Sequence, residues 1–241
     1  TMKNALKNYG FVEPKIDETH YVAGDGRLLG AAILNSTGDW EKWLPVFEHQ
    51  AKNFETFGCT AFGLQSQIET MHNFLYGIEP NYDERYNYNI AKINPPGVDP
   101  QITYESVRRK GVIQGLLPMT STLEEFRTPR PMIEPYLSEG KKWLSNYFFD
   151  HDWVLTGNES QEKRIEILER ELKKSILGVS VTAWIEEDGV YVDDGQPNTH
   201  WCDLYKIDDQ YLYVFDSYDT SKKKLPHSHR ISFAKRIVLY K

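Results

Sequence analysis

The sequence is poor in cysteine and has no long hydrophobic run. Its two cysteines, Cys59 and Cys202, stand far apart in the chain, whereas a secreted domain of this size that is held by disulfides carries more of them. We therefore expect two reduced thiols in a cytoplasmic protein. The most apolar stretch, residues 28–34, has seven residues, far fewer than the roughly 20 that cross a bilayer. Since no apolar segment follows the first charged residues either, the sequence predicts no signal peptide, no membrane span and no membrane partner.

Positive charge is also scarce. The 241 residues include 28 Lys and Arg against 35 Asp and Glu, which gives a net charge of −7, and a protein that binds nucleic acid needs a basic face for the phosphates. We therefore expect no nucleic acid as a partner, and the short basic run at residues 222–224 is predicted to be a solvated loop. Hydrophobic residues make up 40% of the chain, enough to bury a core, and the length suits one domain built from two lobes.

Apolar residues recur with a helical period in two segments. From Cys59 to Leu75 they are spaced by three or four positions, and Gly77 is placed to end a helix there. Residues 161–176 repeat the pattern, with polar residues before them and Gly178 as the expected stop. A shorter helix is predicted from Tyr104 to Lys110, while residues 80–100 have no such period and are expected to be irregular.

The apolar period changes from 3.6 to 2 after Gly178. Alternating residues predict strands at 179–185, 201–206, 211–215 and 231–240, with a hairpin turn at 208–210. Helices that precede an antiparallel sheet indicate an α+β fold, with a cleft where the two halves meet.

Cys59 stands at the start of the first predicted helix, directly after Gly58. Unpaired N–H groups and the positive end of the helix dipole at such a position favour a thiolate, which is the nucleophilic form of cysteine. A free cysteine is more often a small buried hydrophobic residue, so this position alone does not establish catalysis.

A histidine and an aspartate are expected to meet at one edge of the sheet. His200 begins the second predicted strand and Asp216 follows the third. Because the start of one strand and the end of the next are neighbours in a hairpin, the two side chains can pair as a base and the group that orients it. The alternative is a partly exposed histidine beside a surface carboxylate.

Several segments resemble the papain-like cysteine peptidases. Residues 57–62 (Phe-Gly-Cys-Thr-Ala-Phe) are similar to that family's Gly-Ser-Cys-Trp-Ala-Phe helix start, and residues 178–181 (Gly-Val-Ser-Val) to its Pro-Val-Ser-Val strand. Residues 189–192 followed by His200 resemble its Gly-Ile-Tyr … Asp-His segment, and residues 214–220 its Asn-Ser-Trp-Gly-Thr box. His200 lies 141 residues after Cys59, within the family's interval of about 130–150.

Within that family the sequence most resembles the divergent members of tailed phages and bacteria. The motifs that carry this likeness are Asp39-Trp40, Leu44-Pro45, residues 48–50 (Glu-His-Gln) and residues 59–62. It implies a cytoplasmic or virion-associated protein. The resemblance covers roughly residues 40–240 and implies a single papain-like catalytic domain, with an N-terminal extension and strand at 1–45, a mainly helical lobe at 46–135 and a mainly β lobe at 136–241.

The resemblance implies a Cys-His-Asp triad that hydrolyses peptide bonds through a thioester. Cys59 would be the nucleophile, His200 the base, Asp216 the residue that orients it, and Tyr218 a ring that shields the site from water. Gln50 is the expected donor to the oxyanion, with Asn53 as the alternative, because the family's Gln stands six residues before its Cys. The expected partner is a peptide or protein substrate. No cofactor and no metal are expected, and the pattern specifies no oligomeric state.

The sequence departs from the family at several positions. Thr60 replaces a Trp, Asp216 stands where Asn is usual, and no propeptide-like segment is recognised, so the usual activation scheme is not expected. Cys202 is predicted to pack beneath the site, and His227 and His229 to lie in a loop.

Two other functions fit parts of the same pattern. A transglutaminase-like or amidase acyl transferase also has a His … Asp strand pair, although its Cys-to-His interval is usually much shorter. A non-catalytic virion or scaffold protein that retains a peptidase fold is the other alternative.

Overall fold

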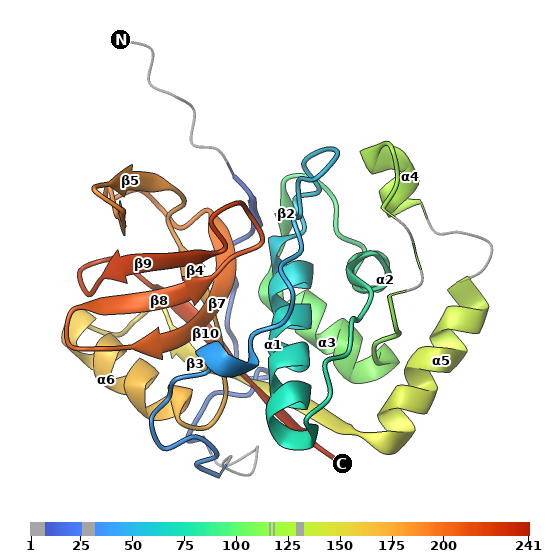
Figure 1. Ribbon diagram of the computed structural model, residues 1–241, viewed down its shortest axis with the longest axis horizontal. Coiled ribbons are helices and arrows are strands. Elements are labelled where there is room, and N and C mark those ends of the chain that lie inside the picture. The colour runs from blue at the N-terminus through green and yellow to red at the C-terminus, as the bar shows by residue number, and fades with distance from the viewer. Residues whose placement is uncertain (1–7, 26–31, 116, 118, 129–132) are drawn as a thin grey trace.

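In a computed structural model of the chain, helices and sheet lie on opposite sides of the molecule (Figure 1). The structure describes residues 8–25, 32–115, 117, 119–128 and 133–241. Most of the apolar run at 28–34 lies outside these residues. The helices on one side are α1 (Cys59–Tyr76), α2 (Glu84–Ile90), α3 (Pro100–Lys110), α4 (Leu123–Arg127) and α5 (Ile133–Asn146), while α6 (Gln161–Leu172) packs on the sheet and a short 3₁₀ turn, η1 (Glu41–Trp43), precedes α1.

The second half of the chain forms a six-stranded antiparallel sheet. Its strand order is β3-β10-β4-β7-β8-β9, and two short two-stranded sheets, β1-β2 and β5-β6, accompany it. This is an α+β arrangement with two lobes, as the sequence predicts. The strands are β1 (Gly10–Phe11), β2 (Gly97–Val98), β3 (Phe148–Thr156), β4 (Leu177–Val181), β5 (Ile185–Glu187), β6 (Val190–Val192), β7 (His200–Ile207), β8 (Tyr211–Phe215), β9 (Lys222–Pro226) and β10 (Phe233–Tyr240).

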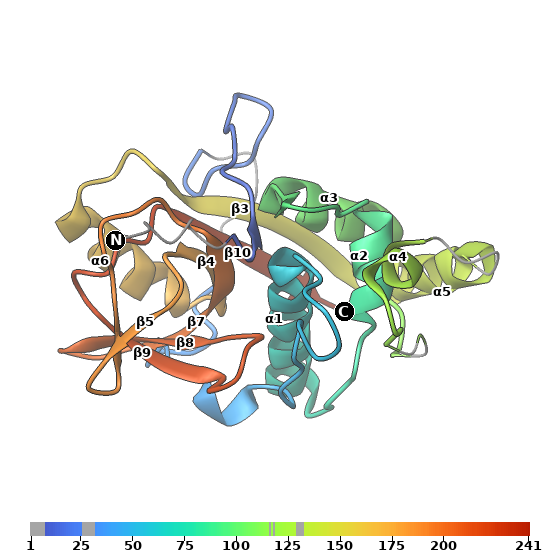
Figure 2. The same ribbon diagram turned by 90° about the horizontal axis from the view of Figure 1, so that it is seen from above.

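Helix α1 lies between the sheet and the other helices (Figure 2). It begins at Cys59, directly after Gly58, and ends at Gly77, whose left-handed backbone (φ 65°) allows its N–H to bond the Asn73 carbonyl at 3.0 Å. Elements cover α1 on more than one side, so its polar residues are buried together with its apolar ones. The expected helix and its glycine stop are confirmed.

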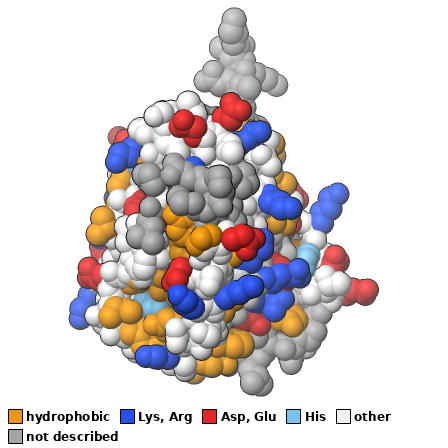
Figure 3. All heavy atoms as spheres, turned by 90° about the vertical axis from the view of Figure 1, so that its right-hand side faces the viewer, with side chains coloured by type: hydrophobic (Ala, Val, Ile, Leu, Met, Phe, Trp, Pro, Cys, Tyr) orange, Lys and Arg blue, Asp and Glu red, His pale blue; other side chains and the backbone are white. Residues whose placement is uncertain are grey.

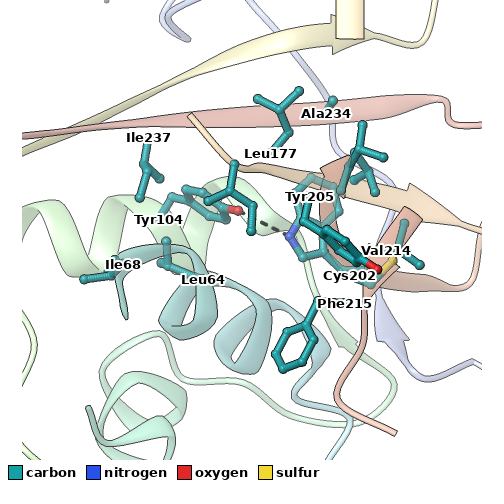
Figure 4. Packing of buried hydrophobic residues seen from close by; sticks show 14 of the residues in the cluster. Leu64, Ile68, Tyr104, Leu177, Cys202, Tyr205, Val214, Phe215, Ala234 and Ile237 are labelled. Carbon is teal, nitrogen blue, oxygen red and sulfur yellow. Dashed lines mark hydrogen bonds between the residues drawn. The ribbon is translucent and has the colours of Figure 1, made fainter. Parts of the chain in front are cut away.

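A buried polar network joins α1 and α3 to the sheet. The Gln67 amide donates to the Tyr104 hydroxyl and to the Asp203 carboxyl, both at 2.7 Å, and the Trp201 indole donates to the same hydroxyl at 3.3 Å. Figure 4 shows the Tyr104 hydroxyl among the buried residues between the helices and the sheet. Gly178 on β4 makes room for these groups, because a Cβ there would lie 2.3 Å from the hydroxyl. The glycine is therefore required by close packing of the two lobes.

Several elements differ from the sequence prediction. Helix α6 ends at Leu172 and not at Gly178, where the sequence predicts its stop. Gly178 lies inside β4, because residues 177–181 pair with β7 and β10 in the sheet. Residues 80–100 contain helix α2, which begins at an Asp83 side chain that caps the Tyr86 N–H at 2.7 Å. The basic run at 222–224 is not a solvated loop but part of strand β9, whose pairing with β8 satisfies its backbone.

The outer face of the helical side carries charges of both signs (Figure 3). On α3, Glu105 accepts hydrogen bonds from Arg108 at 2.6 Å and from Arg109 at 2.5 Å. Exposed pairs of this spacing contribute only about 0.2–0.5 kcal/mol each, so packing rather than surface charge holds the helices. Among the residues that the structure describes, no helix is both long and apolar enough to cross a membrane.

A methyl group at Gly178 tests the packing of the two lobes. Gly178→Ala should lower the free energy of unfolding by about 1–3 kcal/mol, because overfilled cores relax poorly, and urea unfolding measures the loss. Adding Tyr104→Phe should recover part of it by removing the hydroxyl that the new Cβ meets, so the two changes should not be additive. An unfolding midpoint equal to that of the wild type would contradict the close approach.

Candidate active site

The thiol of Cys59 lies against the start of strand β7. Cys59 is the first residue of α1 and is fully buried, and its sulfur is hydrogen-bonded by the backbone N–H of Trp201, the residue after His200. Gly63, one turn further along α1, allows this approach, since a Cβ there would lie 3.1 Å from the Trp201 ring. The helix and the strand that carry the predicted nucleophile and base therefore meet at their first residues.

His200 and Asp216 form a buried pair. Nε2 of His200 lies 2.5 Å from Oδ1 of Asp216, and both side chains are completely buried. Burial alone would raise the pKa of Asp216, but His200 and the ammonium of Lys223 hold that pKa below its ordinary value. The carboxylate is thus ionised and can only accept, so Nε2 of His200 carries the proton.

The other ring nitrogen of His200 is free to take up a proton. Within the part of the chain that the structure describes, Nδ1 is buried and has no hydrogen-bond partner. With Nε2 protonated toward Asp216, Nδ1 is the basic nitrogen of the neutral ring. In this structure the Cys59 thiol is paired with the Trp201 N–H and not with His200.

Burial dominates the ionisation of Cys59 in this structure. It raises the pKa of the thiol well above its usual range, and the negative charges of Glu55 and Asp216 raise it further, against the hydrogen bonds from the N–H groups of Trp201 and Thr60. The lowered pKa expected from the helix start is therefore not met in this state. The thiol stays neutral as long as water is kept from it.

Gln50 is held at the site by several hydrogen bonds. Its amide nitrogen lies 3.1 Å from the Tyr9 carbonyl, 2.8 Å from the Glu55 carboxylate and 2.9 Å from the Tyr218 hydroxyl, and its amide oxygen accepts from Ser217 at 2.7 Å. The alternative oxyanion donor, Asn53, is exposed and donates to the Thr120 carbonyl at 2.9 Å. Of the two candidates, the structure brings Gln50 next to the residues around His200.

Tyr218 packs against His200. Their ring centroids are 5.4 Å apart, and the Tyr218 hydroxyl donates a very short hydrogen bond to Glu55.

Cys202, two residues after His200, belongs to the same core cluster as Val214 and Phe215 (Figure 4), and burial raises the pKa of its thiol. Cys202 is thus a core residue beneath the site.

Residues 8–12, called here the N-terminal segment, lie across the site. The Tyr9 N–H donates to the Thr199 carbonyl at 3.0 Å, the Tyr9 carbonyl accepts from Gln50, and the Tyr9 ring stands edge-on to His200 with centroids 5.5 Å apart. Strand β1 pairs in parallel with β2 near the start of α1 (Figure 1).

Gly10 lets the segment lie close to the residues before Cys59. Its φ is 116°, and a Cβ there would lie 2.1 Å from the Phe57 carbonyl oxygen. Two-residue strands leave no apolar period, so the sequence alone does not show that residues 8–12 pack beside His200 and Gln50.

A cavity of about 790 Å³ borders the same site on its helical side. It is lined by apolar rings and by charges of both signs, and His49 in its wall stands 5.5 Å from the Tyr218 ring. Its volume is that of a ligand pocket. Representative lining residues are Phe47, Phe62, Arg85, Met119, Phe126 and Asp219.

No protein-family model and no curated protein matches the sequence, but solved structures are similar to it. One is digestive procathepsin L 3 of the Tenebrio molitor larval midgut, with a TM-score of 0.62 and 12% identity over 97% of this chain and 77% of that one. Another is the Amb a 11 cysteine protease, a major ragweed pollen allergen, in its proform, with a TM-score of 0.62 and 13% identity over 84% of this chain and 66% of that one. The chain has the papain-like fold.

Proposed function

We propose that this chain is a cysteine peptidase in which Cys59 is the nucleophile, His200 the base and Asp216 the residue that orients it. The observation that carries the proposal is the meeting of α1 and β7, where the Cys59 thiol lies against the residue after His200 while His200 is bonded to Asp216. Nucleophile, base and orienting group then form one buried unit. The fold that the chain shares with cysteine proteases supports the same reaction.

The geometry supports hydrolysis through an acyl-enzyme. Nδ1 of His200 takes the thiol proton, and the thiolate attacks the carbonyl carbon of a peptide bond. The imidazolium returns the proton to the leaving amine, and the neutral ring then activates the water that hydrolyses the thioester. Gln50 and the Cys59 N–H would donate to the oxyanion, where losing one donor typically raises the barrier by about 2.7–4 kcal/mol.

The N-terminal segment is proposed to block this site. The Gln50 amide that would serve the oxyanion is engaged by the Tyr9 carbonyl, and the Tyr9 ring stands edge-on to His200. Both similar structures are precursor forms according to their descriptions. In this proposal the chain is inactive until the segment moves away, and the cavity beside Gln50 then receives part of a peptide or protein substrate.

The origin of the chain stays a prediction from its motifs. The phage and bacterial likeness rests on the residues around Trp40, Pro45, Gln50 and Cys59, whereas the two similar structures are of proteins from Tenebrio molitor and ragweed.

Displacing the N-terminal segment should expose Cys59. Gly10→Ala places a Cβ against the rigid Phe57 carbonyl. If this clash destabilises the docked segment by about 1–3 kcal/mol, the ratio of displaced to docked segment rises about 5- to 150-fold. Alkylation of Cys59 by iodoacetamide, followed by mass spectrometry of the intact chain, should accelerate by that factor. The same spectra would reveal cleavage within the segment.

Gly24→Ala is the matched control. Gly24 also has a positive φ (91°) but has no atom within 4 Å of a new Cβ, so it introduces similar backbone strain without the steric clash. Equal alkylation rates in the two variants would show that the segment does not cover the thiol.

Removing the thiol should abolish peptide cleavage. Wild type, Gly10→Ala, and Gly10→Ala with Cys59→Ala are compared on a peptide library with product detection by mass spectrometry. Cleavage should be fastest in Gly10→Ala and absent once Cys59 is replaced, because no other group supplies the nucleophile. Cys202→Ala in the same background should retain cleavage, since Cys202 packs in the core. Cleavage that survives Cys59→Ala would refute the mechanism.

A further inference from the structure

Lys223 is a buried ammonium at the far side of the candidate triad. Its side chain is 2% exposed, and its Nζ lies 2.8 Å from Oδ2 of Asp216, 2.9 Å from the Asp219 carbonyl and 2.7 Å from the Thr220 carbonyl. These three acceptors use all three N–H donors of an ammonium. The neighbouring Lys222, by contrast, is 49% exposed and pairs with Glu41 on the surface.

Aromatic rings complete the surroundings of the ammonium. Nζ lies 5.2 Å from the centroid of the Trp184 ring and 5.5 Å from that of Tyr191, and Trp184 also stands 5.7 Å from the His200 ring. Burying an unpaired charge is costly, and a carboxylate, two carbonyls and two ring faces offset that cost. Such a site holds the ammonium at a fixed place next to Asp216.

Asp216 is thereby shared between two partners. Its Oδ1 pairs with His200 and its Oδ2 with Lys223. In the family that the motifs resemble, the orienting residue is a neutral Asn. An unpaired Asp in that place would stabilise the imidazolium, whereas Asp216 and Lys223 together carry no net charge.

We propose that Lys223 is a positioning residue of the triad, whose ammonium neutralises Asp216 so that the pair orients His200 as a neutral amide would. This inference rests on the proposed peptidase function. This role accounts for an Asp at position 216, because the second carboxylate oxygen forms an ion pair with Lys223 on β9. Because the Asp216–Lys223 pair has no net charge, it does not stabilise the imidazolium of His200, which can then release its proton to a leaving amine.

The pH dependence of the reaction reports this role. Without Lys223, the full negative charge of Asp216 acts on His200 and favours the imidazolium, typically shifting such an equilibrium by about 1–3 pH units. The alkaline limb of kcat/KM, where the one proton shared by the Cys59 thiol and His200 is lost, should therefore move to higher pH. The substitution leaves in place the other titratable side chains around the site: Tyr9 of the N-terminal segment, Glu55 before α1, Cys59 on α1, Cys202 and Asp203 on β7, and Tyr218 after β8. The charge of Asp216 raises the pKa of all of these except Glu55, and Lys223 lowers that of Cys202.

The experiment compares variants of Lys223 and Asp216 in the Gly10→Ala chain. Lys223→Met removes the charge and keeps the length of the side chain, and it should move the alkaline limb up by about one pH unit or more. Asp216→Asn alone leaves a buried ammonium without its carboxylate and should lose most of the activity. The double variant, Asp216→Asn with Lys223→Met, restores a neutral orienting group. It should recover the activity and return the alkaline limb of kcat/KM to its position in the Gly10→Ala chain.

Controls separate charge from structure. Lys223→Arg should keep the wild-type pH profile, and Lys222→Met, the exposed neighbour, should change nothing. A uniform loss of kcat/KM at every pH in Lys223→Met, or a double variant no better than the poorer single one, would overturn the proposal.

A readout that needs no catalysis distinguishes this proposal from the proposed function. In a Cys59→Ala background, the titration of the His200 ring is followed by NMR with and without Lys223→Met. A shift to higher pH supports the role of Lys223 even if the chain cleaves no peptide. An unchanged titration overturns it even if the chain is an active peptidase.

Discussion

The site depends on how closely the first turn of α1 approaches the first residues of β7. Gly63 leaves space for the Trp201 ring, and the Trp201 N–H reaches the Cys59 sulfur. This contact joins two segments that are far apart in the chain, and the buried network around Tyr104 and Gln67 fixes their distance. Because interiors are close-packed, a small change in this packing moves the sulfur relative to the imidazole.

Much of this arrangement follows from local patterns in the sequence. The apolar spacing after Cys59 and the stop at Gly77 predict α1, and the alternation of 211–215 predicts β8 with the hairpin before it. The order of these elements also brings His200, at the start of β7, next to Asp216, at the end of the neighbouring strand β8, as strand pairing requires. The structure places the two side chains together, while their catalytic roles stay predictions.

Other features could not be read from local pattern because tertiary contacts decide them. Gly178 resembles a helix stop, yet strand pairing on both sides places it in β4. Lys223 sits in a run of lysines that is typical of a solvated loop, and only the pairing of β9 with β8 turns it inward to Asp216. The thiol pKa, expected to be lowered by the helix start, is raised instead, because burial outweighs the helix dipole.

The N-terminal segment belongs to the same chain as Thr199 and Gln50, to which it is hydrogen-bonded, and this has a thermodynamic consequence. A connection within the same chain gives a bound group an effective concentration that does not depend on the concentration of the protein. A two-residue strand and a few hydrogen bonds would make a weak complex between separate molecules. They are enough to hold a segment that belongs to the same chain and cannot diffuse away. Dilution therefore cannot release the segment; only a stronger competitor, or a cut in the connecting chain, removes the advantage of the tether.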